Sequence, residues 1–194
     1  MVRELAVIKP TETIPVAKPR PARFSLAAGP AMDLGLGHFG ASLHTDVAAW
    51  GWLTKGAGVR AFASLPLATA HFTVPEGTAQ VTAALLGLGV TYDLRPAEKV
   101  WIPIVGAGIV AAHVVTLGQG NLPRTNSSDS GWYGGGYGQL GLALRVAPAL
   151  RVRLDAVAMA LASPPSVLVD ERSVGHWGRP AGLMSLAVEL FWAP

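Results

Sequence analysis

Histidine and serine are the residue types in this chain whose pairing could carry nucleophilic chemistry, and a cysteine nucleophile is excluded because the sequence contains no cysteine. A histidine beside a serine can act as a general base and activate the hydroxyl group. The candidates are His38, His71, His113, His176, Ser127, Ser128 and Ser130. They form no recognisable spaced motif, and no histidine pair has metal-ligand spacing with a carboxylate as third ligand. We therefore predict no catalytic residue, no metal site and no bound cofactor.

The composition indicates that much of the apolar surface does not face water. Hydrophobic residues make up 51% of the 194 residues and charged residues only 14%, whereas soluble domains are typically about 25% charged. The net charge of +3 derives partly from basic residues that precede Arg23. Nucleic-acid binding requires a clustered basic face, so a nucleic-acid partner is not expected.

Apolar stretches that alternate residue by residue are separated in turn by short and long polar interruptions. Eight candidate strands cover residues 22–33, 38–53, 58–72, 77–94, 98–117, 131–146, 150–163 and 179–193. Tight turns are expected at 54–57, 95–97 and 147–149, and mostly longer loops at 34–37, 73–76, 118–130 and 164–178. Each strand exceeds the roughly 9 to 11 residues that a tilted strand needs to cross a bilayer. This rhythm predicts an all-β fold: an antiparallel up-and-down transmembrane barrel of eight strands in a bacterial outer membrane.

Alternation within strands predicts which side chains face lipid. In residues 150–163 the even positions are apolar, whereas Arg151, Arg153 and Asp155 occupy odd positions and would face the lumen. The segment 77–94 keeps no single phase, which a bulge near Ala84 would explain. For residues 98–117 we expect the odd positions to line the lumen.

A barrel of eight strands is only wide enough for its own side chains, so we predict a lumen filled by neutralised charges rather than a wide pore. If the last two strands pair about a loop centred near residue 171, Arg153 lies opposite Glu189. The predicted lumen charge network consists of Asp46, Arg60, Arg145, Arg151, Arg153, Asp155 and Glu189.

Aromatic residues fall near the predicted strand ends. In transmembrane barrels such residues gather in girdles at the two membrane interfaces. The predicted girdle residues are Phe24, Phe39, Trp50, Trp52, Phe72, Tyr92, Trp101, Trp132, Tyr133, Trp177, Phe191 and Trp192.

Two rival architectures are open. Residues 100–117 form an uncharged apolar run long enough for a membrane helix, although Pro103, two glycines and many β-branched residues argue against helix. A soluble lipocalin-like barrel would place the apolar residues inside and the polar ones outside.

The first 21 residues read as a separate segment. Prolines at 10, 15, 19 and 21 favour extended backbone, so we predict a proline-rich periplasmic tail over 1–21 and the barrel over 22–194. The apolar run 5–8 is too short for a signal peptide. A mature form, a trimmed form or the C-terminal part of a longer chain is therefore expected.

The segments GWYGGGYGQLGLALRV, LRVRLDAVAMAL and RPAGLMSLAVELFW, together with the eight-segment layout, resemble the small outer-membrane barrels of the OmpA and OmpX type. The resemblance covers about residues 22–193 and implies a Gram-negative outer-membrane location with periplasmic termini. It implies a structural anchor or a surface-exposed interaction protein rather than an enzyme. Outer-membrane lipid, and a periplasmic domain or complex held through the tail, are the expected partners. The alternatives are a small-solute channel and a lipid-modifying enzyme at the barrel rim.

Overall fold

The computed structural model describes residues 24–35, 40–54, 56–74, 77–94, 100–120, 127–169, 172–178 and 180–192. Its strands are β1 (Phe24–Gly35), β2 (Ala41–Trp52), β3 (Ala57–Pro66), β4 (Ala70–Val74), β5 (Gly77–Asp93), β6 (Trp101–Gly120), β7 (Ser127–Ala147), β8 (Leu150–Leu161), β9 (Ser166–Val169), β10 (Arg172–His176) and β11 (Ala181–Trp192). No helix within these ranges is long and apolar enough to cross a membrane.

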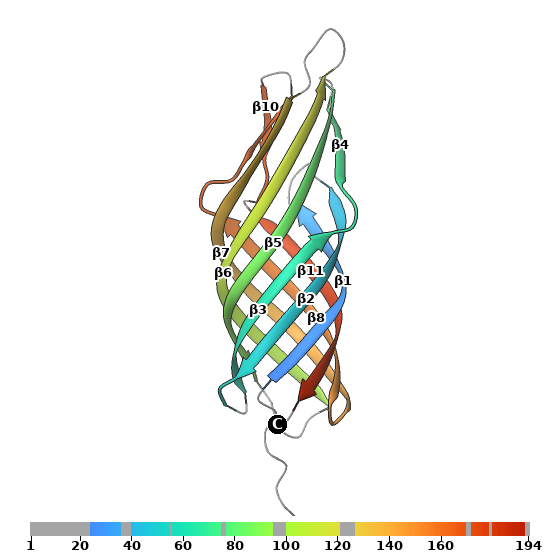
Figure 1. The fold of residues 1–194 in the computed structure, drawn as a ribbon, viewed down its shortest axis with the longest axis vertical. Helices are drawn as coiled ribbons and strands as arrows, with labels where there is room; N and C mark the ends of the chain where they lie inside the picture. The colour runs from blue at the N-terminus through green and yellow to red at the C-terminus, as the bar shows by residue number, and fades with distance from the viewer. Residues whose placement is uncertain are drawn as a thin grey trace, which may run out of the picture.

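The strands close into one antiparallel barrel (Figure 1). Each wall strand pairs with its neighbours in sequence, and β1 pairs with β11 to complete the ring. Strands β3 and β4 both pair with β5 and form one interrupted wall strand, which gives eight wall strands in all. The predicted fold class is confirmed.

The two ends of the barrel differ in their connections. At the short-turn end, β1 begins beside the last residues of β11, and the turn at 148–149 joins β7 to β8. At the opposite end, which we call the loop end, β4, β5, β6 and β7 rise beyond the remaining wall strands, and the β9–β10 hairpin lies beside them (Figure 1).

Several strand and loop boundaries in the structure differ from those predicted from the sequence. The apolar run 100–117 belongs to β6, so the alternative of a membrane helix there is wrong. The expected strand 58–72 breaks at residues 67–69, where the amides of Leu67 and Ala68 donate to the Leu43 carbonyl oxygen. The expected loop 164–178 contains the β9–β10 hairpin, and β6 and β7 extend into the expected loop 118–130.

Strand β5 contains no bulge near Ala84. Its pairing with β6 runs in continuous register from Gly77 to Asp93, so the predicted bulge is wrong. One outward face carries Thr78, Gln80 and Thr82 towards the loop end and apolar residues such as Leu86 towards the short-turn end. The apparent change of phase is therefore a change of solvent, from water to lipid, along one face of one strand.

Strand β6 faces the opposite way from the prediction. Its even positions, among them Ile104 and Val110, are buried in the barrel, whereas Ile109 is 67% exposed on the outer wall together with the half-buried His113. Both faces of this strand are apolar, so alternation of polarity does not define an inner face. The inner face is set by packing, because a Cβ at Gly108 would overlap the Tyr137 ring.

The interior has two zones. Towards the short-turn end it contains the charged side chains described below. Towards the loop end it becomes apolar, with Val81, Leu85, Val114 and Leu161 in one buried cluster that includes Trp177. Strand β9 lies against β5 and β6 at this end.

Candidate functional site: the charged interior

The barrel wall separates charge from apolar surface. In the described part of the chain, nine charged residues of the wall strands face the interior: Asp33, Asp46, Arg60, Asp93, Arg145, Arg151, Arg153, Asp155 and Glu189. All are buried except Arg145, which is half-buried. The large exposed residues of the outer wall are instead apolar, among them Leu26, Leu43, Val47, Leu88, Val90, Leu140, Leu154, Leu186, Val188 and Leu190.

A chain of hydrogen bonds crosses the interior between facing walls. Arg60 on β3 lies 3.6 Å from the Asp46 carboxylate and donates from Nη1 to the Gln139 side-chain oxygen at 2.9 Å. Gln139 donates in turn to Asp155 Oδ1 at 2.7 Å. Arg153 donates from Nε to the other oxygen of the same carboxylate at 2.6 Å. The amide of Gln139 therefore links two ion pairs that are far apart in the sequence.

A second group of contacts lies nearer the short-turn end. Arg153 Nη1 is 3.6 Å from Glu189 Oε2, and Ser25 donates a hydrogen bond to the other oxygen of Glu189 at 2.8 Å. The Trp52 indole donates to Ser25 Oγ at 3.0 Å. Arg151 donates to Asp93 at 2.9 Å. Buried charges need such partners, because an unpaired ion in a low-dielectric interior costs several kcal/mol, on the order of 3 to 5.

Aromatic rings support the guanidinium groups. The Trp50 ring lies beside two of them, with its centroid 4.4 Å from Arg153 Cζ and 5.5 Å from Arg60 Cζ. Arg151 lies over the Phe191 ring at 4.2 Å. The electron-rich face of an aromatic ring attracts a cation, and more strongly where water is excluded. These rings therefore complete the surroundings of the arginines where no carboxylate is present.

The structure brings the seven residues of the predicted network into one interior, with one change of register. Glu189 is directly opposite Arg151, and Arg153 is opposite Ala187. The predicted pairing of Arg153 with Glu189 across the strands was therefore wrong by two residues, although the long side chain of Arg153 still reaches that carboxylate. Asp93 was missed, because it ends a strand beside a predicted turn and its partner Arg151 lies on a strand that is distant in sequence.

The aromatic residues divide between the two faces. Those exposed on the outer wall are Phe24, Tyr92, Trp101, Trp132 and Trp192. Trp50 and Trp177 are wrongly predicted as girdle residues: they are 1% and 3% exposed, inside the barrel. Tyr133 and Trp52 pack against the buried cluster, and Phe191 stacks on Trp52 with ring centroids 6.3 Å apart. Phe39 and the Phe72 side chain lie outside the described residues.

The sequence did not reveal that some of these aromatic side chains face inward. The sequence places them near strand ends, and position along a strand does not reveal which face carries the side chain. Trp50 shares the inward parity of Asp46 and His44 on β2, and that parity is the signal that could have identified it.

Those candidate nucleophilic groups that the structure describes lie apart from the charged interior. His71 is exposed, and His113 lies on the outer wall with its ring centroid 5.0 Å from that of Trp132. Ser128 and Ser130 are exposed on β7. His38 and the side chains of His176 and Ser127 lie outside the described residues. The remaining histidine, His44, is fully buried and was not among the candidates.

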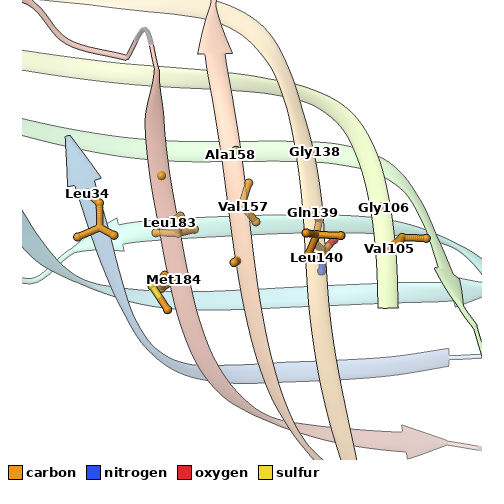
Figure 2. Close-up of a pocket in the computed structure, with 12 residues that line it drawn as sticks. Leu34, Val105, Gly106, Gly138, Gln139, Leu140, Val157, Ala158, Leu183 and Met184 are labelled. Atoms are coloured by element: carbon orange, nitrogen blue, oxygen red, sulfur yellow. The ribbon is translucent and has the colours of Figure 1, made fainter. Parts of the chain in front are cut away.

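A shallow hollow lies over β6, β7, β8, β11 and the end of β1 (Figure 2). Its volume is about 610 Å³. It forms because Gly138, Ala158 and Gly182 are adjacent on neighbouring strands, and a Cβ at Gly138 would meet no atom within 4 Å. Leu34, Leu140 and Met184 are among the larger side chains that line it. The hollow is almost entirely apolar, as a surface against acyl chains must be.

Comparisons with known proteins show that the fold of this chain is similar to that of several solved structures. No protein-family model matches the chain, and no curated protein sequence matches it. The crystal structure of Neisserial surface protein A aligns with a TM-score of 0.62 at 12% identity, over 88% of this chain and 98% of that one. Ail, the attachment invasion locus protein of Yersinia pestis, aligns with a TM-score of 0.56 at 9% identity, over 89% and 100%. The N-terminal β-barrel domain of Pseudomonas aeruginosa OprF aligns with a TM-score of 0.54 at 10% identity, over 87% and 97%. The chain thus has the fold of the small eight-stranded outer-membrane barrels.

Proposed function

We propose that the protein is a structural anchor or surface-exposed interaction protein of a bacterial outer membrane, with a lumen closed by its own side chains. One observation carries the proposal: nine described charged residues of the wall face the interior, and the large exposed side chains of the outer wall are apolar. That arrangement suits a bilayer and is the reverse of a lipocalin-like barrel in water. The names of the Neisserial surface protein and of the attachment invasion locus protein suggest a role at the cell surface.

The proposal includes an orientation, with the termini in the periplasm and the loop end outside the cell. Transmembrane barrels of bacteria have short periplasmic turns and longer external loops, and the short-turn end holds the beginning of β1 and the end of β11. The N-terminal segment 1–21 would then connect the barrel to a periplasmic domain or complex. Recognition of an external partner would fall to the loop end.

Single-cysteine variants test the location and orientation together. The chain has no cysteine of its own, so Ser130→Cys near the loop end and Pro148→Cys in a short turn report separate ends of the barrel. We expect a membrane-impermeant maleimide to label Ser130→Cys in intact cells, and to label Pro148→Cys only after the outer membrane is permeabilised. Labelling of Pro148→Cys alone in intact cells would reverse the orientation. Recovery of the protein without detergent in the soluble fraction would overturn the membrane location.

Conductance across a planar bilayer distinguishes a filled lumen from a small-solute channel. Because Arg60, Arg153 and Trp50 occupy the interior and the Trp50 ring lies beside both guanidinium groups, we expect the inserted protein to give no steady stepwise conductance above that of the lipid. Regular current steps that scale with the number of inserted molecules would contradict the filled lumen and favour the channel.

A further inference from the structure

A separate polar cluster lies in the interior where β1 approaches the loop end. His44 on β2 is hydrogen-bonded through Nδ1 to Ser64 Oγ at 3.1 Å and through Nε2 to Ser42 Oγ at 3.0 Å. Its Nε2 is also 3.9 Å from Asp33 Oδ2 on β1. His44 and Ser64 are fully buried and Asp33 is 3% exposed. The cluster joins three neighbouring strands.

Among the described charged residues of the interior, Asp33 is the carboxylate without a matching arginine. In the described part of the chain, four arginines face the lumen, Arg60, Arg145, Arg151 and Arg153, and four carboxylates lie among them, Asp46, Asp93, Asp155 and Glu189. This group is electrically balanced. Asp33 is the fifth inward carboxylate, and His44 is the basic group in contact with it. A buried carboxylate without a compensating charge is strongly unfavourable.

We infer that Asp33 and His44 together form a proton-binding site that holds one proton in the folded barrel. With one proton the pair is neutral as a whole, whichever of the two side chains carries it. With no proton the interior would contain a surplus buried carboxylate, and with two it would contain a surplus buried imidazolium. Either surplus charge would be buried beneath the apolar zone of the loop end.

The described groups that surround the pair do not supply the balancing charge. Asp46 of β2 and Arg60 of β3 point into the same interior but form their own ion pair at 3.6 Å. Opposite β1, strand β11 presents Leu183 to Asp33 and Ser185 to the next inward residue, Ala31. The described side chains of β3 and β11 that lie near the pair therefore carry hydroxyl groups or are apolar. The exception is Arg60, which is already paired with Asp46.

A site with one retained proton makes stability depend on pH in a specific way. In an unfolded chain, aspartate loses its proton near pH 3.9 and histidine near pH 6.5. Between these values the unfolded pair also binds about one proton, so the site contributes no slope. Above about pH 6.5 the unfolded pair binds none while the folded pair binds one, so stability falls as pH rises. Below about pH 3.9 the unfolded pair binds two, so stability falls as pH falls.

Asp33→Asn provides the decisive comparison. The variant removes the carboxylate, so the folded state should hold His44 neutral and bind no proton at the site. Its stability should then be level above about pH 6.5 and fall below that value, because the unfolded histidine takes up a proton that the folded one does not. The wild-type protein should instead lose up to about tenfold in its folding equilibrium constant per pH unit from pH 6.5 to 8.5.

Urea unfolding of the barrel refolded in phosphatidylcholine vesicles, followed by tryptophan fluorescence at several pH values, measures both curves. His71→Gln, at an exposed histidine, is the control and should keep the wild-type curve. His44→Gln should move the onset of the alkaline loss from about pH 6.5 to about pH 4, because the remaining aspartate would retain a proton that its unfolded form loses. It also provides a second reading if Asp33→Asn does not fold. Equal slopes above pH 6.5 in the wild type and Asp33→Asn would overturn the proposal. If only His44→Gln folds, a stability that stays level between about pH 4 and 6.5 in that variant would overturn it.

Discussion

Replacing Arg153 with methionine should lower the free energy of unfolding by about 3 to 5 kcal/mol, the usual cost of removing one partner from a buried ion pair. Arg153 is fully buried and contacts two carboxylates, Asp155 at 2.6 Å and Glu189 at 3.6 Å. Methionine keeps much of the side-chain volume but leaves both acids without their shared cation. Urea titration of the refolded barrel in vesicles measures the loss.

A partner replacement shows whether the loss comes from charge. If unpaired carboxylates cause it, adding Glu189→Gln to Arg153→Met should recover part of the stability, and the two substitutions should be non-additive by about 0.5 to 3 kcal/mol. Strict additivity would show that Arg153 and Glu189 are not coupled in the interior. A loss below about 1 kcal/mol for Arg153→Met would show that the arginine is not essential to the interior.

The second large effect is expected at Gly135. This glycine faces inward on β7, and a Cβ there would overlap the carbonyl oxygen of Ala160 on β8. The backbone would have to shift in two paired strands, and such overpacking typically costs about 1 to 3 kcal/mol. We expect Gly135→Ala to lose that amount in urea titration and to refold in lower yield into detergent.

Gly134 is the matched control for this substitution. It precedes Gly135 on the same strand and faces outward, where a Cβ would meet no atom within 4 Å. Gly134→Ala should therefore leave stability within about 0.5 kcal/mol of the wild type. A similar loss in both variants would mean that glycine matters through backbone flexibility rather than close approach.

The sequence was sufficient for the fold where polarity alternated cleanly. On β8, Arg151, Arg153 and Asp155 define the inner face, and the structure buries all three. On β6 the same argument failed, because alanine, valine, isoleucine and glycine occupy both faces. Which face is inner there depends on Tyr137 across the pair at Gly108, and that contact requires the register to be known.

The sequence was enough to predict most of the charged residues that face the interior, but not all the contacts between them. Charged residues on the minority face identify a lumen network, because lipid excludes them. The link from Arg60 through Gln139 to Asp155 depends on facing walls of the closed barrel, which no local spacing records. Asp33 and His44 lie instead on the neighbouring strands β1 and β2, and their contact depends on the register of that pair, in which Asp33 is opposite Ser42.

The change of polarity along β5 also determines how deep the barrel sits. Moving the barrel through the bilayer towards its short-turn end by one pair of residues would carry Thr82 into hydrocarbon, and moving it towards its loop end would bring Leu86 into water. Of the exposed aromatics described, Trp132 lies towards the loop end and the other four towards the short-turn end. At the leaflet on the loop-end side, we therefore expect the depth of the barrel to be set chiefly by the position at which the outer face of β5 changes from apolar to polar. Substitutions at that border should shift immersion depth without altering the fold.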